Sequence, residues 1–266
     1  MRYSIITVNY NNKEGLRKTI ESVVHQTYRD FEFIVIDGGS TDGSIDILKE
    51  YDQQINYWVS EKDSGIYNAM NKGIKKAIGD YLNFMNSGDC FYQNDVLETV
   101  NSKKSTADMI VGRDYHFDIV SKQGFTAILP PRLSMLTFVN DTLPHQSTFF
   151  KKELFNESLY DETLRYAADM KFYLQKICVD QCSVLFIDDI ICQREPNGIS
   201  MINLNKCKEE YKTIVKGFLP AGAIKDYETI HLLDKSTMYK LMGILEDAKC
   251  RKWLTYCIKI IHRMFQ

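Results

Sequence analysis

This chain of 266 residues lacks several features that mark particular classes of protein. It contains no run of about 18 uncharged apolar residues, which predicts that no segment spans a membrane. A strand-like run follows Met1-Arg2-Tyr3 directly and leaves no room for the apolar core of a signal peptide. The formal net charge is only −2, which gives no reason to expect nucleic acid as a partner.

Paired cysteines are also missing. The seven cysteines are an odd number, none of them forms a CxxC pair, and no histidines stand at zinc-site spacing. We therefore expect free thiols, as in a protein of the reducing cytoplasm. The rest of the composition, 44% apolar and 26% charged, is typical of a globular protein with one large domain or a domain and an appendage.

Two common nucleotide-binding motifs are absent as well. The chain has neither GxGxxG after its first strand nor the GxxxxGK[ST] phosphate loop, so a dehydrogenase or a P-loop enzyme is disfavoured. A nucleotidyltransferase is disfavoured too, because no glycine-rich loop with basic residues is present to hold a triphosphate.

The chain does contain three strand-like apolar runs that each end in a cluster of polar residues. These are Ser4–Val8 with Asn9–Asn12, Phe31–Ile36 with Asp37–Gly43, and Tyr81–Met85 with Asn86–Asp89. In an open α/β sheet, ligands bind just beyond the carboxyl ends of the strands. The three clusters therefore predict one crevice suited to a nucleotide.

Strands and helices alternate through the first half, which predicts an α/β fold with a mainly parallel, three-layer sheet. Helical spacing is found at Glu14–His25, Ile45–Tyr51 and Ile66–Ala77, with a further strand at Ile55–Ser60. Shorter strands are expected later, and then only helices. The strands are Met109–Val111, Phe125–Leu129, Ser147–Phe150 and Val184–Ile187, and the helices are Lys206–Gly217, Tyr227–Asp247 and Arg251–Met264.

The second cluster is acidic where a phosphate loop would be glycine-rich. Asp37 at a strand end can accept hydrogen bonds from a base N–H or a ribose hydroxyl, and the glycines after it allow close approach of a ligand. Asp42 fits such a site and fits equally well a helix cap, because Ser40-Thr41-Asp42-Gly43 is a good helix start.

Taken together, the motifs resemble those of family-two inverting glycosyltransferases with the GT-A fold. The resemblance rests on Ile36-Asp-Gly-Gly-Ser-Thr-Asp-Gly-Ser, Gly65-Ile-Tyr-Asn-Ala-Met-Asn-Lys-Gly, Gly79-Asp-Tyr and Asn86-Ser-Gly-Asp, which follow the first strand in the family's order. It implies a Rossmann-like three-layer sandwich at residues 1–202, with a nucleotide-binding half (1–105) and an acceptor-side half (106–202). Residues 203–266 would form a helical extension.

The resemblance also implies a set of nucleotide-binding residues. The nucleoside pocket would be lined by Val8, Asn9, Tyr10, Glu14 and Asp37. The ribose and diphosphate would lie along the segment from Asp63 to Lys72, which includes Asn71, with Asn86 and Ser87 nearby.

The family's metal-binding aspartate motif ends at Asp89, so the resemblance implies Mg²⁺ or Mn²⁺ at this residue. Its expected first and penultimate acids are Asn86 and Gly88 here, and one carboxylate remains for the ion. Phosphates and waters would have to complete the shell. The alternative is a tight turn with a capping aspartate.

An inverting transfer needs a carboxylate that takes the proton of the acceptor hydroxyl. Asp169 is the main candidate, because it stands in the first turn of a predicted helix, as the family's base does. The family often has Glu-Asp where this chain has Ala168-Asp169, and a first-turn acid is also common for electrostatic reasons alone. Asp188-Asp189 is the second candidate.

Two loops complete the predicted site. His145 and Gln146 resemble the family's acceptor-side loop, although a lone histidine is more often an ordinary one. Arg194 and Ser200 lie in a stretch with the composition of a mobile loop, where the arginine could cover the diphosphate. A plain surface loop is the equal alternative.

The last predicted helix is basic and amphipathic. Five basic residues and no acid fall within 249–266, with Trp253 among the apolar residues on the opposite half. This is typical of an element at a membrane surface, here the inner face of the cell membrane. The alternative is that the apolar half packs on the catalytic domain or on a second subunit of a homo-oligomer.

These observations predict an inverting glycosyltransferase that moves a sugar from a nucleotide-diphosphate donor, with a UDP-sugar favoured, to a saccharide or lipid-linked acceptor. Surface polysaccharide or glycolipid synthesis in the cytoplasm is the expected setting. The alternative is a nucleotide-sugar binding protein that has lost efficient catalysis, because Asn86 and Gly88 replace two acids.

Overall fold

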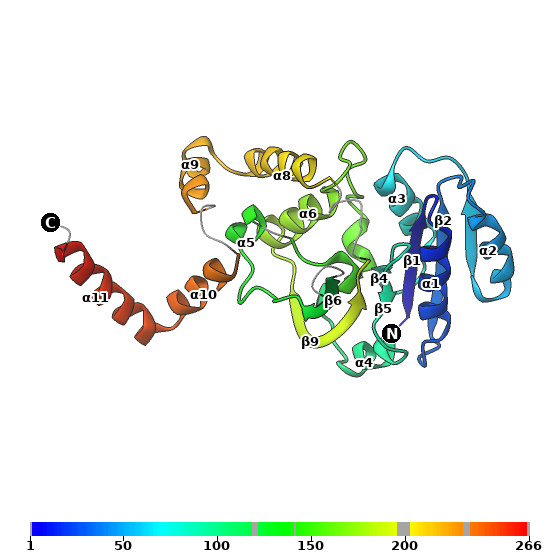
Figure 1. Cartoon of the computed structure of the whole chain (residues 1–266), viewed down its shortest axis with the longest axis horizontal. Coiled ribbons are helices and arrows are strands. Elements are labelled where there is room, and N and C mark those ends of the chain that lie inside the picture. The colour runs from blue at the N-terminus through cyan, green and yellow to red at the C-terminus, as the bar shows by residue number, and fades with distance from the viewer. Residues whose placement is uncertain (1, 119–121, 141, 196–202, 231–234, 265–266) are drawn as a thin grey trace. The chain divides into compact units, whose positions relative to one another are not determined.

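A computed structural model describes residues 2–118, 122–140, 142–195, 203–230 and 235–264 (Figure 1). The chain divides into two compact units. One, the sheet unit, comprises residues 1–129 and 143–213, and the other, the helical unit, comprises residues 130–142 and 214–266. The sheet unit thus includes 203–213, beyond the predicted boundary at residue 202, and the helical unit includes 130–142.

The first half of the sheet unit alternates strand and helix as predicted. β1 (Tyr3–Asn9), β2 (Phe31–Asp37), β3 (Tyr57–Ser60) and β4 (Tyr81–Phe84) are all parallel and lie in the order β3-β2-β1-β4. They are connected by α1 (Lys13–Val24), α2 (Ser44–Glu50) and α3 (Ile66–Lys76), with a 3₁₀ turn at Asp52–Gln54 (Figure 1, blue to cyan). This topology places the carboxyl ends of the four strands at one edge.

The second half continues the same sheet as a mixed one. Beyond β4 the order is β8 (Thr148–Lys151), β6 (Met109–Asp118), β9 (Val184–Gln193) and β5 (Cys90–Phe91), with β7 (Gln123–Thr126) paired to β6. β8 is antiparallel to both β4 and β6, while β6 and β9 are parallel. β6 and β9 are longer than predicted, because they continue through a register shift near Gly112. In β9 the apolar pattern is interrupted by Asp188 and Asp189 before it resumes at the buried Ile191 and Cys192.

Short helices support the strands of this half. They are α4 (Val96–Ser102), α6 (Ala168–Tyr173) and the start of α8 (Leu204–Phe218), with 3₁₀ turns at His145–Ser147 and Lys152–Phe155 and a π-helical turn at Leu174–Val179. β7 begins earlier than the predicted Phe125–Leu129, because it forms a hairpin with β6 in which Phe117 pairs with Gly124.

Each face of the sheet buries a core. Tyr3 and Ile5 of β1 face α1, α2 and α4, whose buried side chains include Leu16, Leu48 and Leu97. Alternation along the strand turns Ile6 to the other face, where α3 packs. That second core continues into a cluster of aromatic rings in edge and stacked contacts, formed by Phe84, Phe150, Phe155, Tyr160 and Phe172.

Gly73 sets how closely α3 approaches β1. A Cβ at this position would lie 2.5 Å from Cγ2 of the fully buried Ile6. We expect Gly73→Ala to lower the free energy of unfolding by about 1–3 kcal/mol, because the overpacking outweighs the helix propensity gained. Chemical denaturation would measure it, with Gly217→Ala in α8 as the matched control. No atom lies within 4 Å of a Cβ there, so the control should be neutral or stabilising.

The helical unit contains α5 (Met135–Asn140), the end of α8, α9 (Ala221–Ile230), α10 (Lys235–Glu246) and α11 (Ala248–Met264). Met242 is buried against Leu136, and Arg132 Nε lies 3.6 Å from Glu246 Oε1. α9 begins at Ala221, earlier than the predicted start at residue 227. Residues 231–234 of the helix predicted over 227–247 lie outside the described residues.

Candidate active site

The structure brings the three predicted polar clusters together at one edge of the sheet. Asn9 and Asp37 are register partners at the ends of β1 and β2, and Asp37 is paired in turn with Ser60 at the end of β3. The loop after β4 is attached to β1, because the Ser87 N–H donates to the Val8 carbonyl over 3.1 Å. The three polar clusters that the sequence analysis expects to form one crevice therefore lie side by side.

Asp37 organises the loop between β2 and α2. One carboxylate oxygen accepts from Asn9 Nδ2 at 2.7 Å and from Ser40 Oγ at 2.6 Å, and the other accepts from the Ser40 N–H at 2.9 Å. Burial alone would raise the pKa of Asp37, but the hydrogen bonds from Ser40, Ser60 and Asn9 outweigh it and hold this pKa below its usual value. The side chain is fully covered, so Asp37 acts here by fixing its neighbours.

The groups that face outward around Asp37 are Tyr10 and Asp63. A Cβ at Gly38 would lie 2.6 Å from Asp63 Oδ2 and 3.2 Å from Tyr10 Cδ2, so both side chains lie close over this part of the loop. Tyr10 is 67% exposed. A free aromatic face beside a carboxylate suits a nucleoside, which presents a flat base and two ribose hydroxyls.

The remaining nucleotide-binding predictions fall in different environments. Val8 is buried, Glu14 is exposed in the first turn of α1, and Lys72 Nζ pairs with Glu61 Oε1 at 2.7 Å. Asn71 is 1% exposed, and its amide group forms hydrogen bonds with the Tyr160 backbone and with Glu162. It lies on the buried side of α3 and anchors the segment that leads to α6.

Asp42 supports the start of α2, as the capping alternative predicted. Its Oδ1 accepts from the Ser44 N–H at 3.0 Å and from Ser44 Oγ at 2.6 Å, while Oδ2 accepts from the Lys13 N–H at 2.8 Å. Asp42 therefore connects the start of α1 to the start of α2.

Asp169 is held between a histidine and a tyrosine. Its Oδ2 lies 3.2 Å from His145 Nδ1, and its Oδ1 accepts from the Tyr67 hydroxyl at 2.9 Å. The residue is only 8% exposed. Burial would raise the pKa of Asp169, but the hydrogen bond and charge of His145 and the hydroxyl of Tyr67 outweigh it and lower this pKa. Asp169 is therefore ionised near neutral pH, as a general base must be.

His145 connects Asp169 to the loop after β4. Its Nε2 lies 3.1 Å from Asn86 Nδ2 and its Nδ1 lies 3.2 Å from Asp169 Oδ2, so the ring bridges the two side chains. The predicted acceptor-side residue and the predicted base thus form one chain of hydrogen bonds with the predicted metal loop.

Tyr67 and Glu210 are site residues that the sequence analysis did not identify. Tyr67 lies within the quoted Gly65–Gly73 motif, but its partner Asp169 is 102 residues away. Glu210 of α8 accepts from the backbone N–H groups of Arg165 and Tyr166 at 2.8 and 2.7 Å, just before α6 begins. No short sequence pattern near either residue indicates these contacts.

Asp89 joins the loop after β4 to two other loops. Its Oδ2 accepts from Gln146 Nε2 at 2.9 Å, and its Oδ1 accepts from the Glu195 N–H at 2.8 Å. Arg194 Nη1 lies 3.4 Å from Asp114 Oδ2. Burial disfavours the charged guanidinium, but Asp114 and Asp89 outweigh it and raise the pKa of Arg194. A fixed positive charge therefore lies beside the Asn86–Asp89 loop.

The residues around Asp89 fit a divalent cation that shares its shell with a ligand. In the described part of the chain, no three His, Cys, Asp or Glu side chains cluster closely enough to hold a metal alone. The loop offers the Asp89 carboxylate and Asn86 Oδ1, a buried oxygen without a partner among the described residues. Mg²⁺ and Mn²⁺ prefer oxygen ligands and accept phosphates and waters in their shells.

The second candidate for the base is placed elsewhere. The Asp188 side chain is 91% exposed and pairs with Arg113, while Asp189 Oδ2 lies 2.7 Å from Lys103 Nζ. Both carboxylates are therefore in ordinary surface ion pairs. Ser200 lies outside the described residues.

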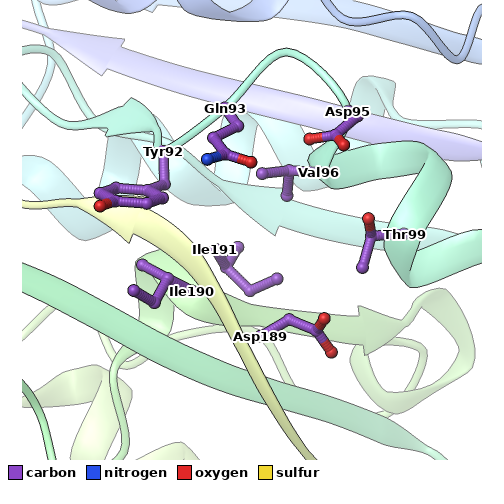
Figure 2. A pocket seen from close by; sticks show the side chains of 8 residues that line it. All are labelled: Tyr92, Gln93, Asp95, Val96, Thr99, Asp189, Ile190 and Ile191. Atoms are coloured by element: carbon purple, nitrogen blue, oxygen red, sulfur yellow. The ribbon is translucent and has the colours of Figure 1, made fainter.

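A hollow of about 170 Å³ lies between α4 and β9 (Figure 2). The hollow is lined by Tyr92, Gln93, Asp95, Val96, Thr99, Asp189, Ile190 and Ile191. Of the residues predicted for the site, the hollow is lined by Asp189 of the second candidate pair for the base, and this carboxylate is already paired with Lys103. We assign no role in the reaction to this hollow.

Comparisons with known proteins agree with this geometry. Residues 4–178 match the family described as Glycosyl transferase family 2. An uncharacterized glycosyltransferase of Mycobacterium tuberculosis is 34% identical over 203 residues, which cover 74% of this chain and 76% of that protein.

Solved structures show the fold. S. aureus TarS 1-349 in complex with UDP-GlcNAc has a TM-score of 0.63 and 16% identity, covering 82% of this chain and 71% of that one. Of the longer S. aureus TarS chain, the match covers 43%. The mannosyltransferase PcManGT from Pyrobaculum calidifontis, in complex with GDP-Man and Mn²⁺, has a TM-score of 0.58 and 14% identity, covering 95% and 83%. The fold is thus of the GT-A type, and the chain belongs to glycosyl transferase family 2.

Proposed function

We propose that this glycosyltransferase moves a sugar from a nucleotide-diphosphate donor, with a UDP-sugar favoured, to a saccharide or lipid-linked acceptor and inverts the anomeric centre. The observation that carries the proposal is the position of Asp169. A buried, ionised carboxylate is tied through His145 to the loop where the diphosphate is expected. The choice of UDP is supported by the TarS complex with UDP-GlcNAc.

In the proposed reaction the acceptor hydroxyl attacks C1 of the donor sugar, and the bond from C1 to the diphosphate oxygen breaks. Asp169 takes the hydroxyl proton. Tyr67 and His145 keep the carboxylate oriented, and Tyr10 and Asp63 hold the nucleoside. Asp89 and Asn86 would hold a divalent cation, which supplies charge neutralisation for the leaving diphosphate when bound. Arg194 adds a fixed positive charge on the same side.

A nucleotide-sugar binding protein with weak or no transfer activity is the second candidate. It is favoured by one observation, the replacement of two acids of the metal motif by Asn86 and Gly88. Such a protein would keep the donor pocket, and no turnover with any donor would then be expected.

A thermal-shift screen tests the donor site directly. UDP, GDP, CDP and dTDP are compared with and without Mn²⁺, because a ligand that binds only the folded state raises the melting temperature. We expect UDP with Mn²⁺ to give the largest shift. The absence of a shift with all four nucleotides would contradict a donor site at this edge.

Helix α11 is the basis for a further part of the proposal, a peripheral contact with the inner face of the cell membrane. Within the described residues, no helix is long and apolar enough to cross a bilayer. α11 instead carries exposed apolar side chains, Trp253 (71%), Tyr256 (64%) and Ile258 (56%), in a segment whose only charges are basic. Such a helix lies in the interface of anionic membranes.

We expect the protein to sediment with vesicles that contain an anionic phospholipid and to remain in solution with purely zwitterionic vesicles. Lys252→Glu with Lys259→Glu should weaken the binding, by about 1 kcal/mol for each basic charge removed from the surface. The pair Lys103→Glu and Lys104→Glu, which lies after α4, serves as the control. Equal recovery with both vesicle types would favour packing of α11 on protein.

A further inference from the structure

The side chain of Glu195 lies against the backbone of Gly88, the position where the resemblance to family two implies an acid. Gly88 has φ = +102°, and a Cβ built on it would lie 3.2 Å from both Cβ and Cγ of Glu195. Here the side chain is absent, and a glutamate from the end of β9 lies against the same backbone.

Glu195 is also directly attached to Asp89. Its N–H donates to Asp89 Oδ1 at 2.8 Å, which fixes the backbone of residue 195 beside the one remaining acid of the motif. Among the residues that the structure describes, no ion pair or hydrogen bond engages the Glu195 carboxylate. The neighbouring arginine turns to Asp114 instead. The glutamate is therefore free to take another partner at this point of the crevice.

The nearby groups are oxygen donors of the kind that a hard cation needs. Asn86 Oδ1 is buried without a partner in the described structure, and the Asp89 carboxylate lies between Gln146 and Glu195. A divalent cation bound by one carboxylate and phosphates would be held weakly. A second carboxylate adds negative charge and a further oxygen ligand, and both raise the affinity of the site for the cation.

We propose that the Glu195 carboxylate replaces the missing acid at position 88 as a ligand of the divalent cation that accompanies the donor's diphosphate. The inference rests on the proposed function, because the cation is expected only together with a nucleotide. It assigns a metal-binding role to a residue that is 107 positions from Gly88 in the sequence and outside the family's motif.

The test measures Mn²⁺ binding itself and not turnover. Free Mn²⁺ is followed by its electron paramagnetic resonance signal during titration into the full chain with UDP present. Glu195→Gln and Glu195→Ala should each weaken Mn²⁺ binding at least about tenfold, since loss of an outer-shell partner alone typically costs 10–100-fold. Both variants keep the backbone N–H that supports Asp89. Glu157→Gln, at an exposed position, is the control and should bind Mn²⁺ as the parent does.

Two further measurements separate the possible outcomes. Melting temperatures without ligand, and UDP affinity without metal, should match the parent, which excludes a folding or nucleotide effect. Parent-like Mn²⁺ affinity in both Glu195 variants would overturn the inference and leave the proposed function standing. A parent that binds no UDP at all would overturn the proposed function and the inference with it.

Discussion

Asp169→Asn is expected to reduce sugar transfer by about 10²–10⁴-fold, the range that a positioned general base contributes. The loss should appear in kcat, because the proposed base acts on the acceptor hydroxyl and not on the nucleotide. Donor affinity should stay at the parent value. The measurement is nucleotide release with a lipid-linked or oligosaccharide acceptor pool, accompanied by calorimetric titration of the donor.

Asp188→Asn is the matched control for this variant. It removes the same charge from the second candidate for the base, whose side chain is 91% exposed and paired with Arg113. We expect parent-like transfer from it. Equal rates in the parent and Asp169→Asn, or a large loss in Asp188→Asn, would remove Asp169 from the mechanism.

The pH dependence of stability checks the ionised state of Asp169 independently. The folded protein lowers this pKa, so the contribution of Asp169 to stability is present above the pKa of the unfolded chain, about 4. It is lost as the pH falls through the lower pKa of the folded state. The difference in free energy of unfolding between parent and Asp169→Asn should thus be largest near neutral pH and shrink below about pH 4.

Asp89→Ala is expected to abolish the effect of Mn²⁺ on UDP binding. In the parent, the metal should strengthen UDP binding because it joins the diphosphate to Asp89, while in the variant the two titrations should coincide. The expected loss of metal affinity is at least about tenfold. Calorimetric titration of UDP with and without Mn²⁺ measures the effect of the metal on UDP affinity in each protein.

Asp95→Ala is a suitable control for Asp89→Ala, since Asp95 is an exposed acid beyond β5. The melting temperature of both variants should show that the fold is intact. If Asp89→Ala responds to Mn²⁺ as the parent does, the assignment of the Asn86–Asp89 loop as a metal site is wrong.

The parts of the site that could be predicted from the sequence are those encoded locally. Asn9, Asp37 and Asn86 each end a strand-like run, and the rule that parallel strands bind ligands at their carboxyl ends brings them together. Asp169 could be placed at a helix start because the apolar spacing that follows it predicts a helix. In these cases a short stretch of sequence contains both the element and the functional residue.

The contacts that determine how these residues act could not be predicted, because they join distant segments. Tyr67 reaches Asp169 across 102 residues, and Glu195 reaches Asp89 across 106. The motif around Asn71 likewise gives no sign that its buried amide is hydrogen-bonded to Tyr160 and Glu162, about 90 residues away. The end of β9 could not be predicted because Asp188 and Asp189 interrupt the apolar pattern before the buried Ile191 and Cys192.

The most direct test of the central claim is the anomeric configuration of the first product. A single carboxylate base on the acceptor side predicts direct displacement and therefore inversion at C1. Proton NMR of the transferred sugar, recorded with an α-linked UDP-sugar donor and the acceptor pool, should show a β-linkage, and the signal should be missing with Asp169→Asn. An α-linked product, or equal product formation by the variant, would contradict the account.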